Sequence, residues 1–184
     1  MNCLNYDCNE TLEDHLPNDC GEEFQGGSNG LVLLECNHQL TDPSSATQIN
    51  AEIAAGRAKL VRNIKLGINA PSSVSIESNI GCESTKVVTY DRSGTLIDGN
   101  VNSQNIDFYN TVFAGRRFGG MIFHECGTEE SADGARVTWI DKVLSFTGGR
   151  VFPSANTEFQ RFEGTFNWRS KIEGQIYPAP TGIF

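Results

Sequence analysis

The apolar residues of this chain fall into short runs of strand length, and this spacing restricts the possible folds more than any other feature. The longest uninterrupted run, Leu31–Leu34, is typical of a buried strand. Apolar and polar residues alternate in segment 60–68 and again in 158–168, where three aromatic residues share one parity. Strands are also expected at 121–126 and 136–146. The pattern predicts β structure along most of the chain.

Two segments carry helix signals instead. Ser45 can cap a helix that Gly56 ends, with Gln48 at the capping-box position. A second helix is expected over 104–114, with Ser103 as its cap. Together, the strands and helices predict a mainly β (α+β) fold: a β-sandwich or flattened barrel with two helices and extended terminal arms.

The polar segment Asp91-Arg92-Ser93-Gly94 has the composition of a turn. It lies between two apolar segments, 86–90 and 95–97, that both favour strand. We therefore expect these segments to form a hairpin with residues 91–94 at its turn.

With 184 residues, the chain is long enough for one domain with a full core. Residues 1–30 are acidic and rich in Cys and Gly, and they predict an irregular N-terminal arm. Residues 31–176 form the predicted β-rich core domain. Residues 177–184 predict an extended, Pro-rich tail, because two prolines exclude both a helix and a central strand. Neither terminal segment is expected to be stabilised by its own domain. We therefore expect both segments to dock on a neighbouring copy of the chain.

The net charge of −9 argues against nucleic-acid binding. The first 56 residues contain ten acidic residues and no Lys or Arg, and the one adjacent basic pair is Arg116-Arg117. Phosphate contacts need clustered basic side chains, so no specific nucleic-acid binding is expected. No apolar run approaches a membrane span, and the N-terminus lacks the features of a signal peptide. Synthesis in the cytoplasm is therefore expected.

Four of the six cysteines fall within the first 36 residues: Cys3, Cys8, Cys20 and Cys36. They offer enough thiolates for a tetrahedral zinc site. Their spacing lacks the close Cys pairs of structural zinc sites, so zinc remains one alternative beside disulfides and free thiols, with free thiols favoured. No other cofactor is expected.

The remaining chemical candidates give no catalytic site. Alternation places His124 and Cys126 on one strand face about 7 Å apart, which is too far for a hydrogen bond. Carboxylates near Asp91 lack the pattern of a calcium loop, and the common nucleotide, hydrolase and metalloprotease motifs are absent. The chain is therefore not expected to be an enzyme. Five aromatic residues could form a stacking platform, but regular alternation favours a core role: Phe152, Phe159, Phe162, Phe166 and Trp168.

In its overall residue pattern the sequence resembles structural proteins of bacteriophage virions, of the type found in Bacteroidetes-infecting phages. It resembles tail-tube subunits more loosely. The Cys-rich start and five further segments carry the resemblance: Asp42-Pro43, Thr89–Arg92, Phe108–Asn110, Phe162–Trp168 and Pro178–Phe184. The resemblance implies a virion location and a β-sandwich that exchanges arms with its neighbours. It also implies assembly into a homo-oligomer and contacts with other virion proteins.

Within the virion, the resemblance favours a tail tube or a tail-associated ring. Acidic residues facing a tube lumen would repel DNA phosphates and let a genome pass without sticking. A capsid decoration protein and a host- or carbohydrate-binding module are the alternatives.

Overall fold

The structure is a computed structural model that describes residues 28–77, 85–125, 136–154 and 159–184. Its elements, in chain order, are β1 (Ser28–Leu34), α1 (Ala46–Ala54), β2 (Ala58–Ile68), β3 (Ser72–Glu77), β4 (Thr85–Asp98), α2 (Ser103–Phe113), β5 (Arg117–Phe118), β6 (Gly120–Glu125), β7 (Arg136–Ile140), β8 (Leu144–Val151), β9 (Arg161–Ser170) and β10 (Gln175–Pro178).

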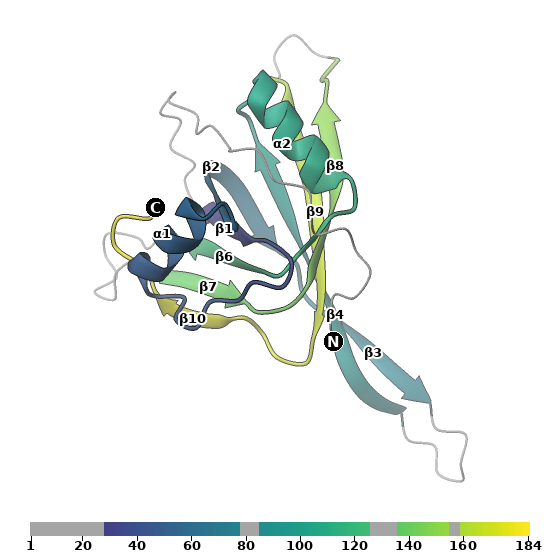
Figure 1. Cartoon of the computed structure of the whole chain (residues 1–184). Helices are drawn as coiled ribbons and strands as arrows, with labels where there is room; N and C mark the ends of the chain where they lie inside the picture. The colour runs from purple at the N-terminus through teal and green to yellow at the C-terminus, as the bar shows by residue number, and fades with distance from the viewer. Residues whose placement is uncertain (1–27, 78–84, 126–135, 155–158) are drawn as a thin grey trace, which may run out of the picture.

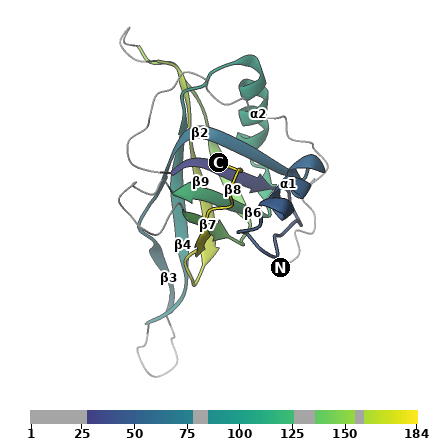
Figure 2. The same ribbon diagram turned by 90° about the vertical axis from the view of Figure 1, so that its left-hand side faces the viewer.

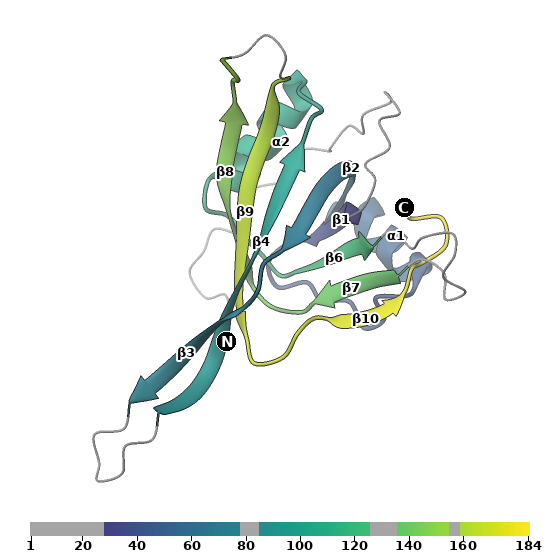
Figure 3. The same ribbon diagram turned by 180° about the vertical axis from the view of Figure 1, so that it is seen from behind.

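The described strands form one antiparallel sheet in the order β10-β7-β6-β1-β2-β4-β9-β8-β5, and β3 pairs with β4 outside this path. The sheet is not closed into a barrel. Its strands twist so far that β4, β8 and β9 cross β6, β7 and β10 at a large angle (Figures 1 and 3). The predicted mainly β fold with two helices is confirmed.

Strand β1 is buried on both faces. Leu31 and Leu33 face the larger core cluster, which also contains aromatic residues of α2, β8 and β9. Val32 and Leu34 face a second cluster beneath α1. Burial on both faces explains why this strand is a continuous apolar run instead of an alternating one.

The two helices cover different parts of the sheet. In Figure 1, α2 lies across β8 and β9, while α1 lies over β1 and β6. Phe108 and Tyr109 of α2 enter the larger cluster, and Ile49 of α1 enters the smaller one. The single sheet therefore supports two cores.

The helix signals located both helices. Ser45 caps α1 by accepting a hydrogen bond from the Gln48 amide at 3.3 Å, as predicted. The cap of α2 lies one residue before the predicted Ser103: the side chain of Asn102 accepts from the Asn105 amide at 2.9 Å. Asn and Ser are equally good caps, so composition alone did not distinguish them.

The hairpin predicted at Asp91–Gly94 is wrong, because β4 runs through this segment without interruption. Three of the four turn-like residues have side-chain or packing roles within the strand instead. Asp91 pairs with Arg169 on the neighbouring strand, and Arg92 is buried. Gly94 lies directly against the ring of Phe166, where a Cβ atom would approach a ring carbon to 2.2 Å. Tertiary packing overrides the local turn propensity here.

The strand predicted over 136–146 is divided. β7 ends at Ile140 and β8 begins at Leu144, so the chain leaves one part of the sheet and enters another between them. The N-terminal boundary also moves: Ser28–Gly30, assigned to the arm, belong to β1. The rest of the predicted arm, residues 1–27, lies outside the described residues.

The C-terminal tail packs on its own domain, which corrects the expectation that it needs a neighbour. β10 pairs with β7 at the edge of the sheet and contains Pro178, whose missing donor is tolerated there. Ile183 is 1% exposed in the cluster beneath α1. Arg62 donates a hydrogen bond to the Ile183 carbonyl, and the Phe184 ring stacks on His124. The tail is apolar because it completes a core that α1 leaves open.

Two glycines make room for the ring of Phe113 on α2. Gly148 of β8 and Gly164 of β9 face each other across the ladder. A Cβ atom on Gly164 would lie 2.4 Å from a ring carbon of Phe113, and one on Gly148 would lie 3.0 Å from the ring. The missing side chains let α2 pack closely on the sheet.

Gly164→Ala should lower the free energy of unfolding by about 1–3 kcal/mol, because the added methyl would lie 2.4 Å from a ring carbon of Phe113 and overpack this contact. Gly149 provides the control, because a Cβ there meets nothing within 4 Å. Gly149→Ala should change stability by less than about 0.5 kcal/mol. Urea denaturation of both variants measures the difference, and equal effects would mean that α2 does not seat on these glycines.

Ile183→Ala should cost about 2–5 kcal/mol of stability, as expected for a buried aliphatic side chain. Thr181→Ala, an exposed change in the same tail, should stay within about 0.5 kcal/mol of the unmodified protein. Thermal unfolding of dilute protein measures both. If Ile183→Ala proves as mild as Thr181→Ala, the tail does not dock on its own domain.

Candidate functional site

The candidate zinc ligands are not brought together in the described residues. Cys36 is buried after β1, whereas Cys3, Cys8 and Cys20 lie outside the described residues. Among the residues that the structure describes, no group of three or more His, Cys, Asp or Glu side chains could hold a metal ion. The zinc site stays a prediction.

Of the possible His–Cys pair, the structure describes His124 alone. His124 is half-buried, and its ring stacks on Phe184 with the centroids 4.9 Å apart. Cys126 lies outside the described residues. The observed contact of His124 belongs to the docking of the tail.

The most deeply buried carboxylate among the described residues, Asp98, is held in a polar network before α2. Its side chain accepts hydrogen bonds from the Tyr109 hydroxyl at 2.8 Å and from the Asn100 amide at 2.7 Å. The Asn105 side chain, also fully buried, donates to the Asn100 carbonyl at 2.9 Å. These bonds fix the turn between β4 and α2, so the buried carboxylate has a structural role.

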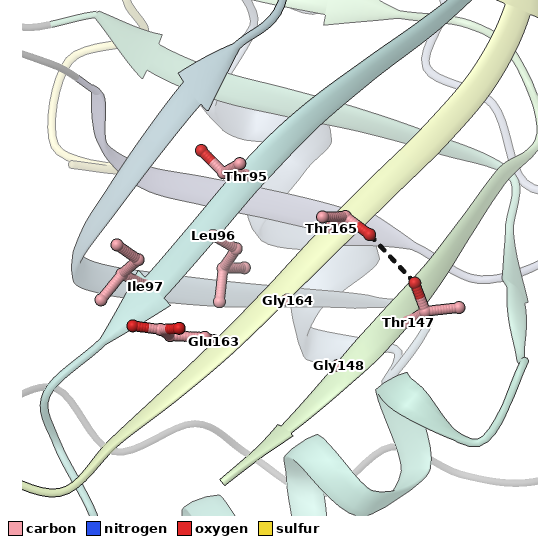
Figure 4. Close-up of a pocket in the computed structure, with 8 residues that line it drawn as sticks. All are labelled: Thr95, Leu96, Ile97, Thr147, Gly148, Glu163, Gly164 and Thr165. Carbon is pink, nitrogen blue, oxygen red and sulfur yellow. Dashed lines mark hydrogen bonds between the residues drawn. The ribbon is translucent and has the colours of Figure 1, made fainter. Parts of the chain in front are cut away.

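One face of the sheet carries a row of exposed threonines that runs across neighbouring strands. Gly67, Thr95, Thr165 and Thr147 are in register across β2, β4, β9 and β8. A shallow cavity of about 370 Å³ lies here, and the hydroxyls of Thr147 and Thr165 are 3.0 Å apart. Figure 4 shows the lining residues and this hydrogen bond. Its one charged side chain, Glu163, is paired with Arg161. The row supplies hydroxyl groups for surface contacts.

A wider cleft of about 820 Å³ lies beside the base of β3. Four basic side chains line it: Arg92, Arg117, Lys142 and Arg169. Basic side chains that line the cleft form ion pairs: Arg92 with Glu173, Lys142 with Asp141, and Arg169 with Asp91. The bond from Arg169 also lowers the pKa of Asp91. Internal pairing neutralises most of the positive charge, so the cleft is a poor site for an anion.

A smaller groove of about 210 Å³ is mainly apolar. Phe123, Ile140 and Trp168 form its floor, and Ile68 and Ile176 stand exposed at its rim. The groove opens where the end of β2 passes close to β10. The sequence placed Ile68 in a predicted strand and gave Ile176 no element, and neither pattern indicated exposure, because exposure here depends on where the sheet twists.

The feature that departs most from a compact domain is the ribbon formed by β3 and the first residues of β4, which is called the β3–β4 ribbon below. It projects from the body at the end opposite α2 (Figures 1, 2 and 3). β9 pairs with β4 only from Tyr90 onward, so residues 85–89 have β3 as their one described partner. The sequence predicted a strand at 86–90 but paired it with 95–97 through a turn at 91–94, so its pairing with β3 was missed.

The expected core role of the aromatic residues is confirmed for three of the five. Phe162, Phe166 and Trp168 are buried. The prediction is wrong for Phe152 and Phe159, which are 64% and 84% exposed at the β8–β9 end of the sheet. Both lie beyond the paired part of these strands, where alternation no longer determines burial.

No protein-family model, curated protein or solved structure matches this chain. Among the described helices, neither has the length and apolar character needed to cross a bilayer.

The buried network predicts a loss of stability in alkali. Burial, the charge of Asp98 and the hydrogen bond to it raise the pKa of Tyr109 well above its ordinary value. Above about pH 10 the unfolded chain loses this proton while the folded chain keeps it, so unfolding becomes more favourable as the pH rises. Tyr109→Phe should lower stability by about 1–3 kcal/mol at neutral pH and reduce the further loss above pH ~10. Denaturant titrations at several pH values test this, and parallel curves for both proteins would contradict it.

Proposed function

We propose that this chain is a non-enzymatic structural subunit of a bacteriophage virion that assembles with copies of itself, as a tail tube or a tail-associated ring. The phage part rests on the resemblance of the sequence. The assembly part is carried by one structural observation, the projecting β3–β4 ribbon.

The ribbon needs a partner for energetic reasons. A two-stranded ribbon in water is only marginally stable, because it has no third strand and buries little apolar surface. In the described part of β3, Ser72, Ser73 and Ser75 are exposed and Val74 is half-buried. A neighbour that covers the ribbon would supply the missing contacts.

The outer edge of β3 is suited to pairing with another strand. Pro71 precedes β3 and Glu77 ends it, but Ser72–Ile76 between them contains no Pro and no charged residue, which are the devices that usually protect an edge. Among the described strands, β3 pairs with β4 alone. Main-chain hydrogen bonds to a strand of another subunit would satisfy the free edge.

A second open edge lies on the same subunit. β5 pairs with β8 only at Leu144 and Ser145, so Phe146–Val151 has β9 as its one described strand partner. A subunit with two open edges can join two neighbours, which is what a ring or tube requires.

The carbohydrate-binding alternative needs exposed aromatic side chains, above all tryptophan. Trp139 and Trp168 are both buried. The described structure therefore favours assembly over a tryptophan-based sugar platform. Other virion proteins remain proposed partners.

Electron microscopy of the purified protein tests the proposed function directly. Rings or tubes at high protein concentration are the expected result. Closed shells would favour a capsid role, and isolated particles at every concentration would contradict self-assembly.

Ser73→Lys/Ser75→Lys should break large assemblies into much smaller species, because charge on an open edge opposes strand pairing. Thr165→Lys/Asn167→Lys adds the same charge on β9, which is paired on both sides, and should leave assembly intact. Sedimentation velocity compares the two, with thermal unfolding as the check on folding. Normal assembly of the β3 variant would exclude this edge as an interface.

A further inference from the structure

The exposed large apolar side chains of the described residues gather at two ends of the molecule. Phe152 and Phe159 lie at the end where β8 stops and β9 begins. Ile68, Ile172 and Ile176 lie around the other end of β9. Scattered single apolar residues are ordinary on a protein surface, but concentration in two patches is typical of interaction sites.

The isoleucine end contains the apolar groove described above. Ile68 and Ile176 line it, and Ile172 precedes Glu173, which also lines it. The volume of about 210 Å³ is enough for an aromatic ring, since an engineered cavity of about 150 Å³ accepts benzene. The groove can therefore receive one phenylalanine side chain.

The phenylalanine end, called the aromatic tip below, presents such a ring. Phe159 is the most exposed of the large apolar side chains, at 84%. The Phe152 ring is partly covered by the guanidinium of Arg150, which lies 4.5 Å from the ring centroid. Phe159 is the side chain best placed to insert, with Phe152 and Arg150 beside it.

A subunit cannot fill its own groove with its own tip. The ten residues of β9 separate the two ends, which corresponds to about 31 Å for nine rises of an antiparallel strand. Figures 1 and 3 show β9 running almost straight between them. The contact is therefore possible only between two copies.

The charges at the two ends are complementary. Arg150 is exposed at the tip and hydrogen-bonds to the neutral Gln160. Glu173 at the groove has a side chain that is 81% exposed, although it also contacts Arg92 at 3.3 Å. Arg150 of one copy can approach Glu173 of the next when the tip enters the groove, which would favour this orientation of the two copies.

We propose that the aromatic tip of one copy docks in the apolar groove of a second copy, with Phe159 as the inserted side chain. This inference rests on the proposed self-assembly and names one of its contacts. The two surfaces differ, so the contact is head-to-tail and propagates along the direction of β9 or closes into a ring.

Photocrosslinking tests the contact in the full-length protein. Phe159 is replaced by p-benzoyl-phenylalanine, which keeps an aromatic ring, and this protein is mixed with an isotopically labelled unmodified copy. Crosslinks from position 159 to residues 66–71 or 171–178 of the labelled copy are expected. Crosslinks only to other segments, or only within one chain, would overturn the proposal.

Paired variants give the quantitative test. Phe152→Ser/Phe159→Ser and Ile68→Ser/Ile176→Ser should each raise the protein concentration needed for assembly about tenfold or more, because aromatic anchors and their pockets dominate interfaces. The exposed changes Ser154→Ala and Gln175→Ala, one beside each surface, serve as controls and should have no effect.

The outcomes separate this contact from the proposed function. Unchanged assembly of both double variants, with assembly still lost in Ser73→Lys/Ser75→Lys, would overturn the tip–groove contact and leave self-assembly in place. An unmodified protein that stays monomeric at every concentration would overturn both.

Discussion

The burial of β1 on both faces is the constraint on which the rest of the structure depends. Leu31 and Leu33 hold one core and Val32 and Leu34 hold the other, so a single strand joins two packed layers. The sheet must then be covered twice, by α2 on one core and by α1 with the C-terminal tail on the other. Once both cores are filled, the β3–β4 ribbon and the open β8 edge remain without a further described strand partner, and the proposed assembly is assigned to them.

The docked tail changes the physical basis for assembly. The expectation from composition was that both termini need neighbours, because each is poor in its own core residues. Ile183 shows that a short apolar tail can instead close a core within its own chain. The case for assembly now depends on main-chain groups at open strand edges and on apolar side chains at the two ends of β9, which are observed features of the folded domain.

The sequence predicted what local patterns determine and missed what tertiary contacts determine. Both helices and the double-buried strand followed from periodicity and capping, because these signals act within a few residues. Asp91–Gly94 was misread as a turn because its strand conformation depends on Arg169 and Phe166, which are distant in sequence. Exposed Phe152 and Phe159 were misread for the same reason: burial depends on the extent of strand pairing. Of the candidate zinc ligands, only Cys36 lies in the described residues.

Hydrogen–deuterium exchange of the β3 amides, Ser72–Glu77, at low and high protein concentration is the most direct test of assembly through the β3–β4 ribbon. If the ribbon is completed by a neighbouring copy, these amides should exchange rapidly in dilute protein and become protected as concentration rises, while amides of β1 stay protected throughout. Exchange in β3 that is independent of concentration, in protein shown by sedimentation to have assembled, would contradict the account.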